Sequence, residues 1–196
     1  MTAERRNIYL VGPMGSGKTT IGSRLAERLG LEFVDCDQEI EARTGVSVNL
    51  IFDIEGESGF RQRESRILKE LCARKGVLLA TGGGAVVSES NRKLLRTNGL
   101  VIYLQTSIAQ QLERLRRDRS RPLLQTDDKE AKLRKLAKLR NPLYEEVANL
   151  VVPVKHRSLD RSVDMICQAI ATSGDQSVTE PGAQAPRRSR FKHRPS

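Results

Sequence analysis

The sequence predicts an α/β fold in which a mostly parallel sheet carries helices on both faces. Short apolar runs recur along the chain, and between them lie segments whose apolar residues repeat at helical spacing. This alternation is typical of parallel sheets, because parallel strands need a long connection that a helix provides. With 196 residues and 38% hydrophobic content the chain can form one sizeable core. We therefore expect a single domain over residues 1–173.

Five apolar runs are the expected strands, since each is too short for a buried helix. They cover residues 8–11, 33–34, 77–80, 100–104 and 150–154. We expect all five strands to be buried, as the strands of a parallel sheet usually are.

The expected helices lie between these strands and are bounded by turn or capping residues. The first starts near Lys18 and ends at Gly30, and the others cover residues 38–43, 47–54, 60–72, 90–96, 108–117, 129–140 and 159–171. Pro142 lacks the N–H that a helix interior needs, so we expect a kink or a restart near residues 140–141, before a segment at 143–149. From residue 174 onward Gly, Ser, Gln, Pro and Arg dominate, which predicts a disordered basic tail over residues 174–196.

The formal net charge of +10 is concentrated in two segments. Residues 113–140 hold eleven Lys or Arg and five acids, and residues 174–196 hold five Lys or Arg and two acids. These segments contribute +6 and +3, so the rest of the chain is nearly neutral. Trp is absent and aromatic residues make up 4%, so platforms for base stacking are scarce. We therefore do not expect nucleic acid as a partner.

Cysteine and histidine usage limits the possible chemistry. Cys36, Cys72 and Cys167 lie far apart without C-x-x-C spacing, which fits a reduced compartment better than a disulfide framework or a structural zinc site. His156 and His193 are the only histidines, so we expect carboxylates, Lys, Arg, backbone amides or a bound ion to do the chemistry. No run of about 18 apolar residues and no signal-peptide pattern is present, so we expect a cytoplasmic protein without membrane contact.

Residues 12–19 read Gly-Pro-Met-Gly-Ser-Gly-Lys-Thr and fit the phosphate-loop pattern G-x-x-x-x-G-K-[ST]. They follow an expected strand and precede a helix, which is the context that the pattern requires. There the backbone N–H groups can face an anion at a helix N-terminus. Lys18 would reach the β- and γ-phosphates, and the Thr19 hydroxyl would bind Mg²⁺. A GTPase is disfavoured, because no N-K-x-D segment is present to read guanine and Asp53 belongs to an expected helix.

Two acidic residues follow the second strand, at the edge of the sheet where ligands gather. In an extended segment Asp35 and Asp37 would share a face, one near Mg²⁺ and the other near an acceptor hydroxyl. Asp37 could equally be the N-cap of the helix at residues 38–43.

Three further segments have both a functional and a plain structural interpretation. Arg61 and Glu64, three residues apart, could serve a site or form a surface ion pair. The three glycines at 82–84 after Thr81 allow a ligand to approach the backbone closely, or form a flexible turn. Residues 113–128 around Arg121 could close as a lid that excludes water, or form a solvated charged face.

Taken together, six segments resemble those of shikimate kinases in order and spacing. They are residues 12–20, 35–37, 56–64, 81–84, 121–124 and 140–144, and the resemblance spans residues 7–172. Gluconate kinases and nucleoside monophosphate kinases share the phosphate loop but not this set. A kinase for another small hydroxy acid, such as gluconate, is the alternative.

The resemblance implies a three-layer P-loop kinase fold with a five-stranded parallel sheet, a lid at about residues 113–128 and a shikimate-binding subdomain. It implies transfer of the γ-phosphoryl group of ATP to the 3-hydroxyl of shikimate with Mg²⁺, as a step of aromatic amino-acid biosynthesis carried out by a monomer. Asp37 would be the base and would contact the acceptor hydroxyl, with Lys18 and Arg121 as the other catalytic residues.

The resemblance also implies which residues bind the ligands. Arg61 and Arg140 would bind the shikimate carboxylate, a task that suits guanidinium groups, and backbone near Gly83 would complete the pocket. Asp35 would accompany Thr19 at the metal. The residues expected to bind the nucleotide are Gly15, Ser16, Gly17, Lys18, Thr19, Thr20, Arg121 and Arg157.

Overall fold

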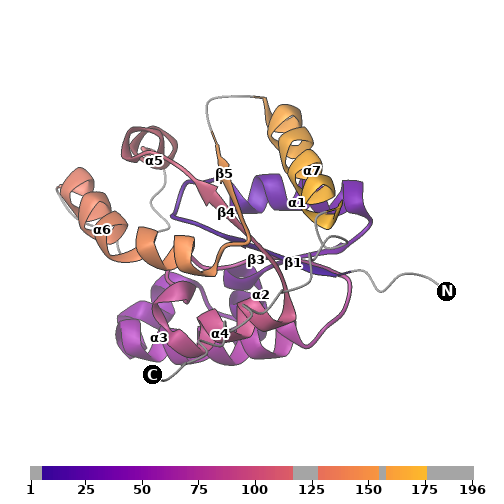
Figure 1. Cartoon of the computed structure of the whole chain (residues 1–196). Helices are drawn as coiled ribbons and strands as arrows, with labels where there is room; N and C mark the ends of the chain where they lie inside the picture. Colours follow the sequence, from indigo (N-terminus) through magenta and orange to yellow (C-terminus); the bar gives the residue numbers. More distant parts are fainter. Residues whose placement is uncertain (1–5, 117–127, 155–157, 176–196) are drawn as a thin grey trace, which may run out of the picture.

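The computed structural model describes residues 6–116, 128–154 and 158–175. They form a five-stranded parallel sheet with the strand order β2-β3-β1-β4-β5 (Figure 1). The strands are β1 (Asn7–Val11), β2 (Glu32–Asp35), β3 (Val77–Ala80), β4 (Gly99–Gln105) and β5 (Leu150–Pro153). Each predicted strand is therefore confirmed to within one residue at either end. The expectation that all five are buried is wrong for β2 and β5, because they are the edges of the sheet and are partly exposed.

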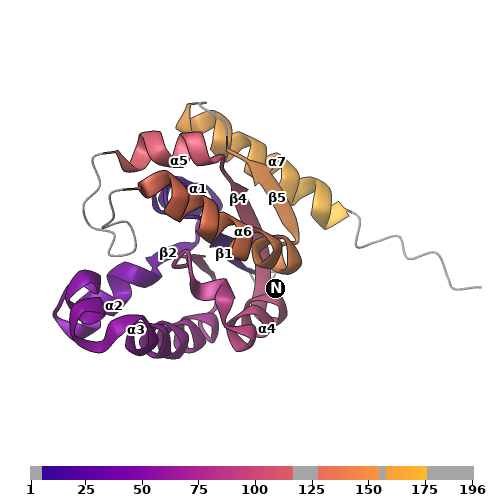
Figure 2. The same cartoon turned by 90° about the vertical axis from the view of Figure 1, so that its left-hand side faces the viewer.

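The helices cover both faces of the sheet, as the sequence predicts (Figures 1 and 2). They are α1 (Lys18–Leu29), α2 (Cys36–Thr44), α3 (Val48–Cys72), α4 (Glu89–Asn98), α5 (Ile108–Leu115), α6 (Lys129–Val147) and α7 (Leu159–Asp175), with a 3₁₀ turn η1 (Ala85–Val87). Short polar side chains start several of them. Ser47, Ser88 and Ser107 each accept a hydrogen bond from a backbone N–H three residues later.

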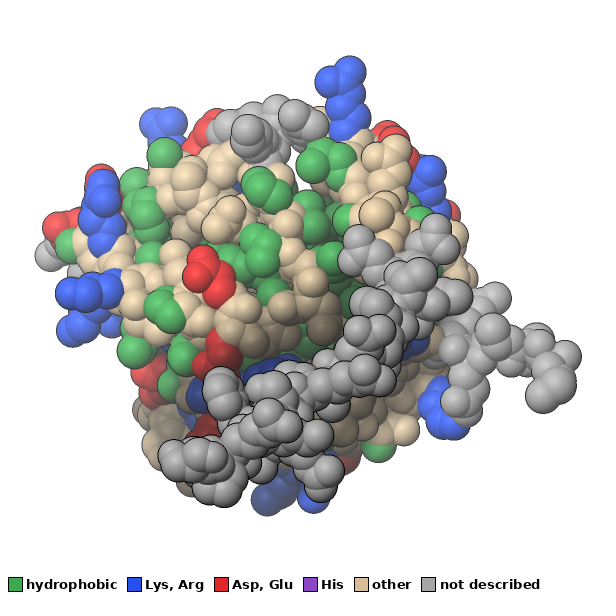
Figure 3. All heavy atoms as spheres, viewed as in Figure 1, with side chains coloured by type: hydrophobic (Ala, Val, Ile, Leu, Met, Phe, Trp, Pro, Cys, Tyr) green, Lys and Arg blue, Asp and Glu red, His purple; other side chains and the backbone are tan. Residues whose placement is uncertain are grey.

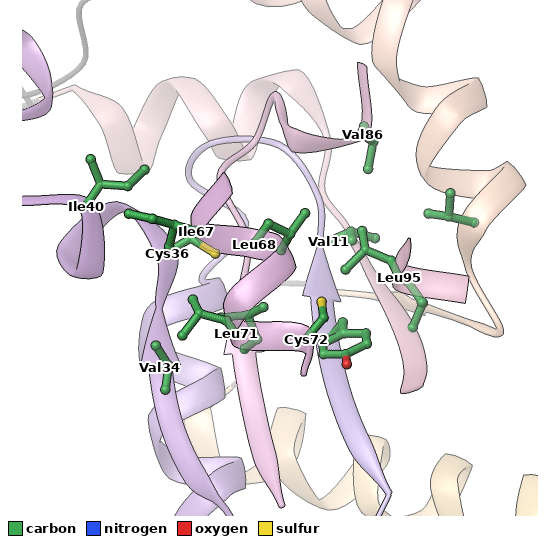
Figure 4. Close-up of a cluster of buried hydrophobic side chains, with 14 of the residues drawn as sticks. Val11, Val34, Cys36, Ile40, Ile67, Leu68, Leu71, Cys72, Val86 and Leu95 are labelled. Atoms are coloured by element: carbon green, nitrogen blue, oxygen red, sulfur yellow. The ribbon is translucent and has the colours of Figure 1, made fainter. Parts of the chain in front are cut away.

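Two hydrophobic cores flank the sheet, because side chains alternate along each strand. In β1, Tyr9 and Val11 face a core shared with α2, α3, α4 and the end of α6, whereas Ile8 and Leu10 face α1 and α7. Figure 4 shows side chains of α3 meeting those of β1 and β2 in the first of these cores. Both faces of β1 are thus packed, which fixes the position of the loop that follows it.

Helix α3 joins two predicted helices, residues 47–54 and 60–72, across a break at Gly56. Gly56 has φ 69° and ψ −177°, a backbone conformation open essentially to glycine alone. A Cβ at this position would meet nothing within 4 Å, so the backbone angle and not crowding requires glycine. The second half of α3, which begins after this break, carries Phe60 and Arg61.

Gly56→Asn is expected to lower the free energy of unfolding by about 1–3 kcal/mol, the usual cost of holding a non-glycine residue in such a conformation. Gly45→Asn is the matched control. Gly45 is also exposed with open space around it, but its φ of 71° and ψ of 7° form a left-handed conformation that asparagine tolerates. Urea unfolding of both variants checks the prediction, and equal losses would contradict it.

A kink or a restart was predicted near residues 140–141, and the restart is wrong because helix α6 runs without interruption through Pro142. The ring of Pro142 removes only the bond to the carbonyl of Lys138, and packing of Tyr144 and Val147 in the core holds the last turns in place. The ribbon of α6 bends along its length (Figure 1), which is the usual effect of an internal proline.

Other predicted boundaries shift slightly. Helix α7 continues to Asp175, two residues beyond the expected domain end at 173. The remaining tail at 176–196 and most of the expected lid, 117–127, lie outside the described residues. The cysteines are free, with Cys36 and Cys72 buried.

The surface drawn in Figure 3 carries its Lys and Arg side chains in small groups around the outline. Hydrophobic side chains lie singly or in small clusters between them. The described residues of this face form no single basic patch. No helix in the described ranges is long and apolar enough to cross a membrane.

Candidate active site

A pocket of about 100 Å³ lies where β1, β2 and β3 end. The register places Asp35 beside Ala80 and Ala80 beside Leu10, so the segments that follow these three strands emerge side by side. The lining residues are Met14, Gly15, Gly17, Lys18, Asp35, Asp37, Val48, Phe52, Phe60, Arg61, Glu64, Thr81, Gly82, Gly83, Gly84 and Arg140. The fold therefore brings together residues from across the sequence that were singled out individually.

The phosphate loop connects β1 to α1, as its pattern predicts. Helix α1 begins at Lys18, and the loop before it turns through Gly12, Gly15 and Gly17, which all have positive φ. Lys18 Nζ donates hydrogen bonds to the carbonyls of Gly12 (2.8 Å) and Pro13 (2.9 Å). The ammonium group is thus held over the loop, beside the N-terminus of α1, where an anion would be attracted.

Other residues of this loop are placed differently. Ser16 is fully buried, and its Oγ lies 3.4 Å from Lys18 Nζ. Thr19 and Thr20 are exposed in the first turn of α1 and lie outside the pocket lining.

Asp35 links the phosphate loop to the second strand. Its Oδ2 accepts a hydrogen bond from Thr19 Oγ1 at 2.7 Å, and its Oδ1 accepts from the backbone N–H groups of Asp37 and Gln38. Asp35 is therefore the N-cap of α2, and the alternative in which Asp37 caps this helix is wrong. The predicted extended segment is also wrong, because Asp37 lies in the first turn of α2, although both carboxylates still line the pocket.

Thr19 and Asp35 offer oxygen atoms suited to Mg²⁺, a hard cation. Within residues 6–116, 128–154 and 158–175 no group of three or more His, Cys, Asp or Glu could hold a metal. A metal at Thr19 would thus take few ligands from the protein, which fits the way Mg²⁺ is commonly held by one or two protein groups and substrate phosphates.

Arg61 and Glu64 form an ion pair across one turn of α3, with Nη1 and Oε2 at 2.7 Å. The prediction of a surface pair is wrong, because the Glu64 side chain is 1% exposed. Burial raises the pKa of Glu64, and the Arg61 guanidinium beside it opposes that shift. The pair lies against the glycine loop, residues 82–87 between β3 and α4. A Cβ at Gly82 would collide with Glu64, and one at Gly84 would collide with Arg61. This close approach explains why glycine stands at positions 82 and 84.

Arg140 projects from α6 into the same pocket and is 5% exposed. Its Nη1 lies 3.4 Å from the carbonyl oxygen of Gly83, its nearest carboxylate in the described structure is Glu57 at 4.0 Å, and its Nε has no partner. Burial lowers the pKa of Arg140, yet a guanidinium remains charged in proteins. A buried cation without a close carboxylate is an attractive site for a carboxylate of a ligand.

An apolar wall faces these charges, and the sequence interpretation missed it. Val48 and Phe52 come from the first half of α3 and Phe60 from the second, with the two phenyl rings 4.7 Å apart. These side chains lie in the two helices expected at 47–54 and 60–72, to which the sequence analysis gave no apolar role in the site. A ligand with a compact apolar ring and a carboxylate would match the wall and the guanidinium groups.

Two predicted site residues, Arg121 and Arg157, lie outside the described residues. Arg114, from the segment assigned to the lid, donates a hydrogen bond from Nη1 to the carbonyl of Gly15 at 2.8 Å. The start of that segment therefore rests on the phosphate loop.

Comparison with known proteins gives one consistent answer. The family described as shikimate kinase matches residues 14–171. The shikimate kinase of Histophilus somni (strain 2336) is 53% identical over 169 residues, covering 86% of this chain and 97% of that protein. That of Pasteurella multocida (strain Pm70) is 54% identical, covering 80% of this chain and 90% of that protein.

Solved structures agree. The shikimate kinase from Acinetobacter baumannii in complex with shikimate has a TM-score of 0.85 and 50% identity, covering 86% of this chain and 94% of that one. A gluconokinase from Sinorhizobium meliloti 1021 shares the fold at a TM-score of 0.60 with only 18% identity, covering 88% of this chain and 95% of that one. The chain belongs to the shikimate kinase family.

Proposed function

We propose that this chain transfers the γ-phosphoryl group of ATP to the 3-hydroxyl of shikimate, giving ADP and shikimate 3-phosphate. The observation that carries the proposal is the convergence of Lys18, Asp37 and two guanidinium groups, from Arg61 and Arg140, on one pocket. This convergence supports a mechanism in which the phosphate-binding loop, Asp37 as the base and the two guanidinium groups all act on one small molecule. The structure of the Acinetobacter baumannii relative in complex with shikimate, which is 50% identical to this chain, supports the choice of acceptor.

In this mechanism the pocket residues position the acceptor and accept its proton. Arg140 and Arg61 would bind the shikimate carboxylate, and the ring would lie against the wall formed by Val48, Phe52 and Phe60. Asp37 would accept the proton of the attacking hydroxyl as its oxygen forms a bond to the γ-phosphorus and the bond to the β-phosphate oxygen breaks. Backbone near Gly83 would close the side of the pocket that faces the phosphate loop.

The nucleotide would be held chiefly by the phosphate loop. Gly15, Gly17 and Lys18 face the pocket, and Lys18 would exchange its carbonyl contacts for phosphate oxygens. Thr19 and Asp35 would hold Mg²⁺, which offsets the negative charge of the transferring group when bound. Ser16, Thr20, Arg121 and Arg157 stay predictions as nucleotide contacts.

The proposal includes a setting for the enzyme. We expect a cytoplasmic monomer, and the three free cysteines are compatible with a reducing compartment.

ADP release from MgATP, with shikimate, gluconate and nucleoside monophosphates offered separately, tests the function. Of these three acceptors we expect only shikimate to support turnover, because only its carboxylate, ring and 3-hydroxyl match the pocket together. Lys18→Ala is the control and should abolish this turnover. ADP release that does not depend on shikimate would contradict the assigned acceptor, and preference for gluconate would select the alternative kinase.

A further inference from the structure

The glycine loop has all its carbonyl groups hydrogen-bonded. Ala85 and Val87 donate their N–H groups to the carbonyls of Gly82 and Gly84. Asn91 donates to Ala85, and Arg92 Nη1 donates to both Val86 and Val87. The donors of these bonds lie in the loop itself or in α4, so the bonds tie the loop to α4.

Gly83 is the exception, because its carbonyl is held from α6. The Tyr144 hydroxyl donates to Gly83 O, and Arg140 Nη1 is a second, weaker donor at 3.4 Å. Gly83 also faces the phosphate loop, where a Cβ added to it would lie 3.5 Å from both Gly12 O and Met14 N. Gly83 is thus the point at which α6, the glycine loop and the phosphate loop meet.

The position of the Tyr144 hydroxyl does not depend on a ligand. Tyr144 is 1% exposed, and its ring stacks on that of Tyr103 in β4 with centroids 5.1 Å apart and planes at 29°. Burial raises the pKa of the Tyr144 phenol, so the group keeps its proton and can only donate to the carbonyl. The bond to Gly83 is therefore built into the fold.

Arg140 is the second donor to the same oxygen, and this contact competes with the binding of a ligand carboxylate. Without the Tyr144 hydroxyl the partly buried Gly83 carbonyl would lack a good donor, and the other donor near it is Arg140 Nη1. A guanidinium drawn toward that carbonyl would offer one fewer N–H to a carboxylate in the pocket. The present arrangement leaves Arg140 only loosely bound to the protein, with its Nε unpartnered.

We propose that Tyr144 is a positioning residue whose hydroxyl binds Gly83 and thereby leaves Arg140 available for the carboxylate of the acceptor. This inference rests on the proposed function. Tyr144 itself lies behind Gly83 and Arg140, outside the pocket lining. Its effect on the acceptor therefore passes through these two residues.

Tyr144→Phe tests the proposal, because it removes the hydroxyl and keeps the stacked ring. The KM for shikimate should rise about tenfold, the usual effect of losing one buried hydrogen bond, while kcat and the KM for ATP change less than twofold. Calorimetric titration with shikimate should show the same rise in Kd. Tyr103→Phe is the matched control: it removes a hydroxyl from the other ring of the stack, which has no hydrogen-bond partner among the described residues, and should leave both KM values unchanged.

A double variant shows whether Tyr144 acts through Arg140. In an Arg140→Ala background, Tyr144→Phe should raise the KM for shikimate little further, because the Arg140 guanidinium through which Tyr144 acts is absent. Independent, multiplying effects would overturn the proposal, as would an unchanged KM in Tyr144→Phe alone. A uniform loss of kcat and of affinity for both substrates, together with a lower Tm, would show a merely structural role. If the wild-type chain shows no turnover with shikimate, the proposed function fails first, and that outcome is distinct from all of these.

Discussion

Asp37→Asn is expected to lower kcat by about 10²–10⁴-fold and to leave the KM for shikimate within a few-fold of its original value. Asparagine keeps the size of the side chain and can still accept a hydrogen bond from the acceptor hydroxyl, but it cannot take up the proton. Asp37 is held in place by its backbone N–H, which donates to Asp35 Oδ1 at 3.0 Å, and the substitution leaves this bond intact. The fold around the site should therefore be unchanged.

Steady-state ADP release with saturating MgATP measures this effect. Glu41→Gln, in the same helix but outside the pocket lining, is a control that should retain full kcat, because glutamine can still accept the hydrogen bond that Glu41 Oε1 accepts from Val48 N. A loss below tenfold in the Asp37→Asn variant would mean that the hydroxyl proton leaves by another route, and Asp37 would then only bind the acceptor.

Arg140→Ala is expected to raise the KM for shikimate by about 10²–10³-fold, with little change in the KM for ATP. Loss of one member of a buried, hydrogen-bonded charge pair typically weakens binding by about 2–5 kcal/mol, or roughly 30-fold to several thousand-fold, and the expected rise lies in the middle of this span. The side chain makes no hydrogen bond shorter than 3.4 Å within the described structure, so its removal should not unfold the protein. The guanidinium is therefore placed for binding more than for stability.

Arg134→Ala is the matched control for this variant. Arg134 lies on the same helix but is exposed and paired with Glu130 at 2.6 Å, so its loss should leave both KM values unchanged. Equal effects of the two substitutions would contradict a specific role for Arg140 and would indicate a general electrostatic contribution of the helix.

The sequence was most informative where one physical signal dominates. The strands were predicted to within one residue because buried parallel strands are continuous apolar runs with polar neighbours, as at 77–80. The phosphate loop was predicted because its backbone geometry requires glycines and a lysine at fixed spacing. Gly30 was recognised as the end of α1 because it adopts the left-handed conformation that closes a helix.

The errors arose where distant contacts decide the outcome. Pro142 predicts a kink or a restart by its local chemistry, and the restart does not occur because the buried side chains that follow it keep the helix continuous. Capping of α2 falls to Asp35 because β2 ends there, and pairing with β3 fixes that end. Glu64 is buried only because the glycine loop, more than fifteen residues later, packs over it. None of these contacts can be read from the neighbouring residues.

The central position of β1 has a consequence for how the chain folds. It is the first strand in the sequence, yet both strands that pair with it come much later: Ile8 pairs with Leu78 in β3, and Asn7 pairs with Gly99 in β4. The entropy cost of closing such long loops must be met before strand pairing contributes any stabilising free energy, so folding of the sheet is intrinsically slow. During synthesis at about 5–20 residues per second, the backbone of β1 therefore stays unpaired on both sides for several seconds. The phosphate loop therefore gains its final shape only after β3 and β4 have been made, and nucleotide binding should be a late and sensitive readout of complete folding.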